Sequence, residues 1–137
     1  MNQVIVSVGS NMDPLENIGK AADILDGMDF LVSVSRFIRT SPEGFKEQPD
    51  FLNGAFYIET SLAEPELKSC LKKIEARLGR IRTENKNGPR TIDLDIVAFN
   101  GEIIDPDYHR YPFVKSSTDE IFEQIRSRKW QRKIKAG

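Results

Sequence analysis

The stretch Gly88-Pro-Arg-Thr-Ile-Asp-Leu-Asp-Ile-Val-Ala-Phe99 holds the clearest strand pattern in this sequence. Side chains of a strand alternate between its two faces. From Thr91 to Phe99 this period of two predicts one apolar face, which is made of Ile92, Leu94, Ile96 and Ala98. Asp93 and Asp95 then point together to the opposite face. The stretch therefore predicts a strand with a core side and an acidic side.

The acidic side, formed by Asp93 and Asp95, is a candidate metal site. Two neighbouring carboxylates on a rigid strand repel each other unless a cation lies between them. Oxygen ligands suit Mg²⁺, which binds one or two carboxylates together with water and substrate phosphates. Arg90 directly precedes the strand, where it could meet such a phosphate. A second interpretation stays open, in which both carboxylates belong to the solvated face of an ordinary strand.

A helix is predicted near the N-terminus, after a short buried strand at Val4–Val8. We expect a capping box in which Asp13 caps, Pro14 takes the first helical position and Glu16 completes the motif. Gly27 is expected to end the helix. Its apolar stripe consists of Leu15, Ile18, Ala22 and Leu25.

Two more strands and a second helix complete the series before the Asp93 strand. The strands are predicted at Leu31–Arg39 and Phe51–Thr60, and the helix is expected to run from Pro65 to Gly79. The order β-α-β-β-α-β predicts an α+β fold of ferredoxin-like type, with an antiparallel sheet and its helices on one face. The other face is left to solvent or a ligand. A last helix is expected from Ser117 to about Lys133.

Length and composition limit the class of protein. The 137 residues fit a single domain over 1–137, and 39% hydrophobic with 30% charged residues fits a globular chain. A net charge of -1 argues against a nucleic-acid binder, and no apolar run approaches a membrane span. The single cysteine, Cys70, fits a reducing compartment. We expect a cytoplasmic monomer that binds neither nucleic acid nor membrane.

Two further clusters could join the aspartates on the uncovered face. Arg80 and Arg82 follow the second helix, and guanidinium groups match phosphate oxygens bidentately. Phe51 and Asn53 share a strand face, where a ring and a carboxamide could stack a flat heterocycle and bond its edge. An exposed charged loop and ordinary strand packing remain the alternatives.

These motifs together resemble the 6-hydroxymethyl-7,8-dihydropterin pyrophosphokinase family. The matching segments follow the family's order and spacing over about residues 3–104. They are Val8-Gly-Ser-Asn11, Arg39-Thr-Ser-Pro-Glu-Gly44, Gln48-Pro-Asp-Phe-Leu-Asn53, Glu59-Thr-Ser-Leu-Ala63, Ile74-Glu75, Leu78-Gly-Arg-Ile-Arg82 and Gly88-Pro-Arg-Thr-Ile-Asp-Leu-Asp-Ile96.

The resemblance implies transfer of pyrophosphate from ATP to a pterin in folate biosynthesis, with two Mg²⁺ ions on Asp93 and Asp95. It implies that Arg82 and Arg90 act with this pair in catalysis. The pterin-binding residues implied by the family are Thr40, Phe51, Asn53 and Phe113. The nucleotide-contacting positions are Glu75, Arg82, Arg90 and Ile96, with His109 and Arg110 as nearby candidates.

The segment 105–137 diverges from the family pattern. Asp105 to Phe113 is several residues shorter than in the family, and Tyr111 stands where the family has an arginine. Two alternatives to the pyrophosphokinase therefore stay open. One is a paralogue that binds pterin or nucleotide but is inactive or altered in substrate, and the other is a ferredoxin-like interaction module without a small ligand.

Overall fold

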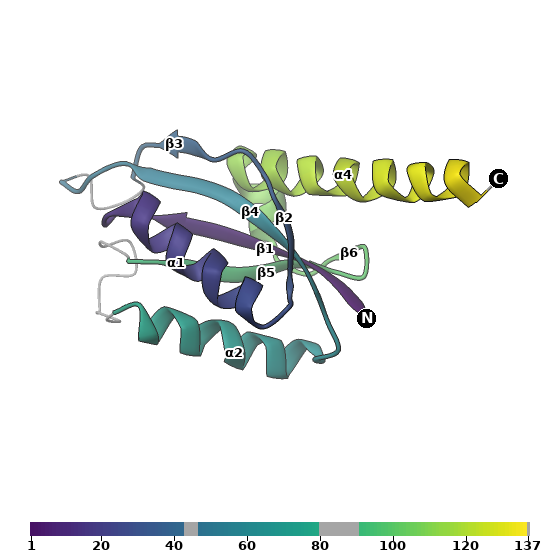
Figure 1. Cartoon of the computed structure of the whole chain (residues 1–137). Coiled ribbons are helices and arrows are strands. Elements are labelled where there is room, and N and C mark those ends of the chain that lie inside the picture. Colours follow the sequence, from purple (N-terminus) through teal and green to yellow (C-terminus); the bar gives the residue numbers. More distant parts are fainter. Residues whose placement is uncertain (43–46, 80–90, 137) are drawn as a thin grey trace.

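The computed structural model describes residues 1–42, 47–79 and 91–136, with side chains described up to residue 128. Figure 1 shows the arrangement of its elements. In chain order they are β1 (Asn2–Ser10), α1 (Pro14–Gly27), β2 (Leu31–Val34), β3 (Ile38–Thr40), β4 (Phe51–Thr60), α2 (Glu64–Arg77), β5 (Asp93–Phe99), β6 (Glu102–Ile103), α3 (Asp107–Arg110) and α4 (Pro112–Ala136).

The sheet has the order β2-β4-β1-β5-β6, and β3 pairs with the other end of the β4 edge that β2 occupies. Every pair is antiparallel. The predicted α+β, ferredoxin-like fold with a C-terminal helix is therefore confirmed. The short strand β6 and the single turn α3 were not anticipated from the sequence.

Helices cover both faces of this sheet (Figure 1). The larger core lies under α1 and α2, and alternate β1 residues Val4, Val6 and Val8 point into it. A smaller core under α4 contains Ile5, Tyr57 and Ile121. The expectation of a wholly uncovered second face was wrong, because α4 begins already at Pro112 and packs on β4 and β1.

The strand predicted at Leu31–Arg39 is interrupted, which gives the separate strands β2 and β3. At the interruption, the Ser35 hydroxyl accepts a hydrogen bond from the Ala55 backbone N–H at 2.8 Å. The Ser35 N–H donates to the Ala55 carbonyl at 2.9 Å. The Phe37 ring then lies directly over Gly54. The break is thus built from specific contacts, and a period-two pattern does not reveal them.

The predicted alternation of the Asp93 strand holds at its start and fails at its end. Ile92, Leu94 and Ile96 join the core under α1 and α2, as expected. A bulge follows, because Val6 pairs with Ile96 while Ile5 pairs with Ala98. Because of the additional residue, the Ala98 side chain points into the core under α4. Placing Ala98 with the other three was therefore wrong.

The first helix starts where it was predicted but not by the predicted cap. Asp13 is in the left-handed conformation, with φ 43°, and makes no side-chain cap hydrogen bond. Glu16 instead pairs with Lys20 at 2.9 Å. Leu15 is 81% exposed, so it does not belong to the apolar stripe. The buried residues of α1 are Asn17, Ile18, Ala21 and Leu25.

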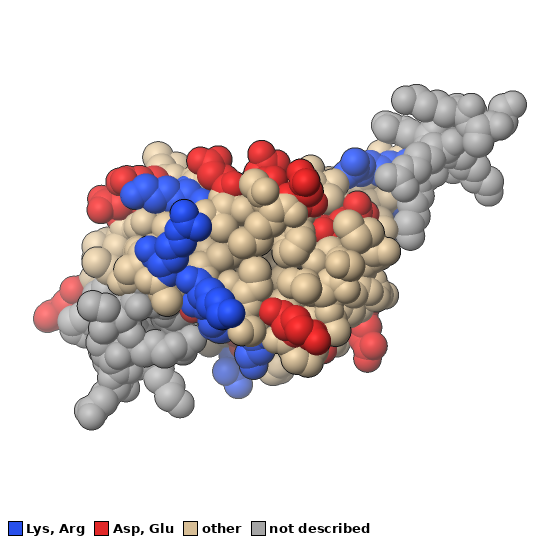
Figure 2. Space-filling model, turned by 60° about the horizontal axis from the view of Figure 1, so that its bottom comes forward, with Lys and Arg blue, Asp and Glu red and all other residues tan. Residues whose placement is uncertain are grey.

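The outer surface carries charges of both signs. Figure 2 views the side that lies at the bottom of Figure 1, and on that face neither the basic nor the acidic described residues dominate. In the described part of the chain, no helix combines the length and hydrophobicity that a bilayer span requires.

Candidate active site

The floor of the candidate site is a patch of three neighbouring strands. Backbone pairing sets Asn53 of β4 opposite Gly9 of β1, and Gly9 opposite Asp93 of β5. The next row on the same face is Ala55, Ser7 and Asp95. Opposed residues of a sheet point to the same side, so both rows face the α4 side. Helix α4 covers the row beyond them and Ala55, whereas the other residues of these two rows border an open cavity.

A cavity of about 420 Å³ lies over this floor. Thr40 and Ser41 line it from the end of β3, and Phe51 and Asn53 from β4. The first residues of α4 and the end of α3 close it from above. Its remaining lining residues are Ser7, Gly9, Asp93, Asp95, Asp107, Arg110, Tyr111, Phe113 and Val114. The cavity therefore combines aromatic rings, a carboxamide and carboxylates.

The Asn53 side chain is held in one orientation from two sides. Its Nδ2 donates a hydrogen bond to the Thr40 hydroxyl at 2.5 Å. Its Oδ1 would lie only 2.8 Å from a Cβ built on Gly9. Glycine at this position therefore gives the carboxamide its room. With its donor partly used by Thr40, the group presents a fixed polar edge to the cavity.

Three of the described aromatic residues border the cavity: Phe51, Tyr111 and Phe113. Phe51 begins β4, and Phe113 lies in the first turn of α4. The Phe113 ring is stacked on Tyr111, with centroids 5.5 Å apart and an interplanar angle of 25°. The guanidinium group of Arg110 lies over the Tyr111 ring, 5.9 Å from its centroid. Phe113 thus has a rigid backing, which suits a wall for a flat ring.

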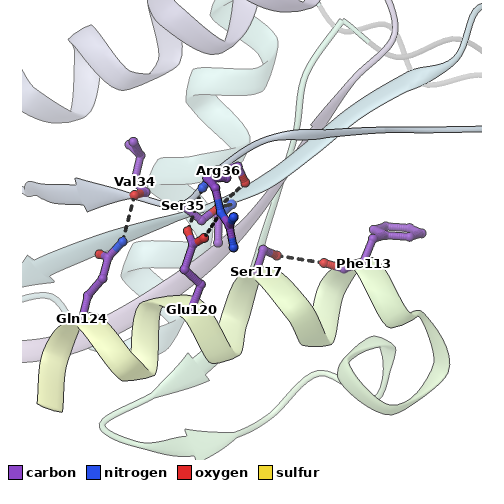
Figure 3. A network of polar contacts seen from close by, with 8 residues as sticks. Val34, Ser35, Arg36, Phe113, Ser117, Glu120 and Gln124 are labelled. Carbon is purple, nitrogen blue, oxygen red and sulfur yellow. Dashed lines mark hydrogen bonds and ion pairs between the residues drawn. The ribbon is translucent and has the colours of Figure 1, made fainter. Parts of the chain in front are cut away.

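Polar contacts hold α4, and with it Phe113, against the sheet (Figure 3). The Glu120 carboxylate accepts hydrogen bonds from the backbone N–H and the Nε of Arg36, at 2.7 and 2.8 Å. Gln124 donates to the Val34 carbonyl at 3.1 Å. The interruption between β2 and β3 therefore provides the docking point for the helix that closes the cavity.

Asp93 and Asp95 lie on adjacent rows of the floor, and both border the cavity. The pKa of Asp95 is raised to about 6, first by desolvation and then by the charge of Asp93, while Lys72 opposes the rise. A cation between the two carboxylates would relieve this repulsion. In the described ranges, no three His, Cys, Asp or Glu side chains are grouped to hold one ion. The pair suits Mg²⁺, which completes its shell with water and phosphate oxygens.

The free edge of β5 is closed by side chains of α2. The Leu94 N–H donates to Glu75 Oε2 at 2.7 Å, and the Leu94 carbonyl accepts from Lys72 Nζ at 3.2 Å. Lys72 Nζ also reaches Glu75 Oε2 at 3.0 Å and Asp95 Oδ1 at 3.3 Å. A second cavity, of about 210 Å³, opens along this edge and is lined by Lys72, Asp95 and Ile96. Asp95 therefore borders both cavities.

The structure brings together most of the residues that the sequence singled out. Thr40, Phe51, Asn53, Asp93, Asp95, Arg110 and Phe113 line the larger cavity. Ile96 lines the smaller one. Glu75 is only 2% exposed and lines neither. His109 is exposed and packs edge-on against Tyr108, outside both linings. Arg80, Arg82 and Arg90 lie outside the described residues.

Sequence reasoning did not single out Ser7, Gly9, Lys72 or Asp107. Ser7 and Gly9 could have been noticed, because they are the small residues that alternate with Val6 and Val8. Lys72 lies one helical turn before Glu75, which is a recognisable spacing for an ion pair. Asp107 depends on the turn at α3, whose pattern is too short to detect. Its pKa is raised by desolvation and by Asp105.

A larger hollow, of about 580 Å³, lies between α1 and α2. Met28, Cys70 and Lys73 are among its lining residues. Most of its lining is apolar, and it contains neither a carboxylate pair nor a carboxamide. Volume alone would favour this hollow, but the chemistry of the lining groups places the candidate site at the open end of the sheet.

Comparison with known proteins points to one family. The sequence model described as "7,8-dihydro-6-hydroxymethylpterin-pyrophosphokinase (HPPK)" matches residues 5–123. The match thus extends past the segment 3–104 and includes α3 and the start of α4.

Three named relatives give the same picture. The 2-amino-4-hydroxy-6-hydroxymethyldihydropteridine pyrophosphokinase of Pseudomonas aeruginosa is 37% identical over 118 residues, which cover 80% of this chain and 72% of the relative. The Bacillus subtilis protein of the same name is 36% identical over 135 residues, covering 90% and 80%. The folic acid synthesis protein FOL1 of Dictyostelium discoideum is 38% identical over 107 residues, covering 77% of this chain but only 16% of that protein.

Proposed function

Because this chain belongs to the 7,8-dihydro-6-hydroxymethylpterin-pyrophosphokinase family, we propose that it transfers pyrophosphate from ATP to 6-hydroxymethyl-7,8-dihydropterin. The products are AMP and the pterin diphosphate, and the reaction belongs to folate biosynthesis. One observation carries the proposal: the 420 Å³ cavity places aromatic walls and a fixed carboxamide beside a pair of carboxylates. A flat heterocycle and a metal-bound phosphate could therefore meet in one place.

The pterin is proposed to bind over β1 and β4. Phe51 and Phe113 supply ring faces, and stacking of aromatic rings contributes about 0.5–1.5 kcal/mol beyond area burial. Asn53, oriented by Thr40, would bond the polar edge of the pterin. This arrangement would direct the hydroxymethyl group towards β5 and its carboxylates.

Asp93 and Asp95 are proposed to hold two Mg²⁺ ions together with the phosphates of ATP. Bound Mg²⁺ would neutralise phosphate charge and align the attacking and leaving oxygens. The nucleotide would extend from these carboxylates along the edge of β5, towards Ile96 and the 210 Å³ cavity. Glu75 would support this edge by holding Leu94.

The hydroxymethyl oxygen would attack the β-phosphorus and lose its proton to solvent, while the bond from this phosphorus to the oxygen of the α-phosphate breaks and AMP leaves with that oxygen. Arg82, Arg90, Arg110 and His109 are the candidates to neutralise charge on the phosphates. Of these, Arg110 already borders the cavity. Since the described part of 105–137 still delivers Arg110 and Phe113 to the site, the geometry favours the active enzyme over an inactive paralogue.

We propose that the protein is a cytoplasmic monomer, the form that was expected from the sequence. Light scattering at micromolar concentration would test the expected monomer.

Formation of AMP from ATP in the presence of the pterin tests the proposal. The wild-type protein should form AMP only when both the pterin and Mg²⁺ are added. Asp95→Ala should lower turnover at least about 100-fold, since the metal contributes several kcal/mol of charge stabilisation. Glu102→Ala, which removes an exposed carboxylate of β6, should retain wild-type turnover. Pterin-independent AMP release, or full activity of Asp95→Ala, would reject the proposal.

A further inference from the structure

Lys72 lies between the two candidate cavities. Its ammonium group makes more polar contacts than a cation on the solvated surface requires. Its ammonium group is within hydrogen-bond distance of Glu75 Oε2, the Leu94 carbonyl and Asp95 Oδ1. These three acceptors match the three donors of a lysine. The side chain starts on the α1–α2 face and reaches around the edge of β5 to a carboxylate on the opposite face.

Two of the three contacts have a structural purpose. Glu75 is buried, with 2% exposure, so its carboxylate requires a compensating positive charge. Leu94 pairs with Val8 of β1, but on the other edge of β5 no strand among the described residues covers it, because β6 pairs only with Ala98 and Phe99. The contact with Asp95 is different, because this carboxylate borders both cavities and the contact neither closes the edge of β5 nor compensates the buried charge of Glu75.

We propose that Lys72 is a positioning residue that makes binding of the divalent cation at Asp95 depend on a polyphosphate. This inference rests on the proposed function and adds a coupling to it. Without phosphate, the ammonium group occupies one oxygen of Asp95 and repels a second cation. The phosphates, which the proposed function places at Asp93 and Asp95, offer the ammonium group another acceptor in place of this oxygen.

The geometry allows this exchange. The Lys72 side chain is 29% exposed and stands on a flexible stem, so a small rotation would move its ammonium group from Asp95 to a phosphate oxygen while it keeps its contact with Glu75. Asp95 is then available to the metal while Glu75 and Leu94 keep their contact with each other at 2.7 Å. By linkage, the phosphate strengthens metal binding and the metal strengthens phosphate binding by the same factor.

Direct titration with Mn²⁺, used as a spectroscopic substitute for Mg²⁺, tests the coupling without any turnover. Lys72→Gln keeps a hydrogen-bond donor but removes the charge. In the absence of nucleotide, it should bind Mn²⁺ about 10-fold more tightly than the wild type, and Lys72→Arg should bind as weakly as the wild type. The matched control Lys73→Gln, in the neighbouring residue that lines the α1–α2 hollow, should stay within twofold of the wild type.

The titration is then repeated with a non-hydrolysable ATP analogue. The analogue should raise Mn²⁺ affinity several-fold less in Lys72→Gln than in the wild type. Thermal unfolding of each variant identifies any that are not folded, and Lys72→Arg provides the charge-conserving measurement. Equal Mn²⁺ affinity and equal coupling in wild type and Lys72→Gln would overturn the inference. If Asp95→Ala also binds Mn²⁺ like the wild type, the proposed metal site itself is wrong.

Discussion

At the scale of single residues, small side chains decide where the site can form. Ser7 and Gly9 lie on β1, the middle strand of the floor, between Asn53 on β4 and Asp93 on β5. A large residue at either position would fill the cavity. On the opposite face of β1, valines pack into the core. Because the side chains of β1 alternate between its two faces, this strand presents valines to the core and small residues to the cavity.

We expect Gly9→Ala to weaken pterin binding about 10-fold or more. The added methyl group would lie 2.8 Å from Asn53 Oδ1 and would rotate the carboxamide away from Thr40. A misplaced partner for a buried polar edge costs about 1–3 kcal/mol. Isothermal titration with the pterin measures the change. Unaltered affinity would show that Asn53 does not require its present orientation.

Gly19→Ala is the matched control, because it makes the same change at an exposed position of α1, where the new Cβ meets no atom within 4 Å apart from the helix's own backbone and its chain neighbours. Pterin affinity should stay at the wild-type value. The melting temperature should rise, since alanine is favoured over glycine inside a helix by about 1 kcal/mol. A lower melting temperature would contradict the assigned environment.

The raised pKa of Asp95 predicts a pH-dependent stability difference in protein without divalent cations. With a pKa of about 6, the folded protein binds more protons than the unfolded chain between about pH 4 and pH 6. Its free energy of unfolding therefore falls as the pH rises through this window. Asp95→Asn removes the charge, so it should gain stability relative to the wild type from pH 4 to pH 7. Urea unfolding of the wild type and Asp95→Asn at pH 4 and pH 7, with a chelator present, measures this difference. A stability advantage of Asp95→Asn that grows as the pH falls would contradict the raised pKa of Asp95.

At the scale of elements, the interruption between β2 and β3 connects the sheet with α4. Ser35 keeps the pairing with Ala55, Phe37 packs over Gly54, and Arg36 offers its backbone to Glu120. A continuous strand would lack this docking point. The same interruption sends β3 along the end of β4, where Thr40 meets Asn53. The orientation of Asn53 and the position of α4 over the cavity therefore both depend on this interruption.

Gly54→Ala should destabilise the protein by about 1–3 kcal/mol, because the new Cβ would lie 2.7 Å from the Phe37 ring. The cost should be smaller in a Phe37→Ala background, where the ring is absent. Chemical denaturation of the four proteins in this double-mutant cycle measures the coupling. Additive effects of the two changes would show that the ring does not press on Gly54.

At the scale of the whole molecule, the sequence predicted the elements with strong periodicity and missed those set by single contacts. Strand β4 begins and ends at the residues expected from the pattern. The bulge near Val97, the break at Ser35 and the short α3 follow from local hydrogen bonds, which leave no periodic signal. For the site, Phe51 and Asn53 were found because they share a strand face. Lys72 was missed because its approach around the β5 edge depends on tertiary packing.

The central claim is that one cavity at the open end of the sheet binds the pterin and directs it towards the carboxylates of β5. A crystal structure with 6-hydroxymethyl-7,8-dihydropterin, a non-hydrolysable ATP analogue and Mg²⁺ tests it most directly. We expect the pterin ring between Phe51 and Phe113, its edge bonded to Asn53, and Mg²⁺ ligated by Asp93 and Asp95. A pterin bound in the hollow between α1 and α2, or Mg²⁺ without contact to either aspartate, would contradict the claim.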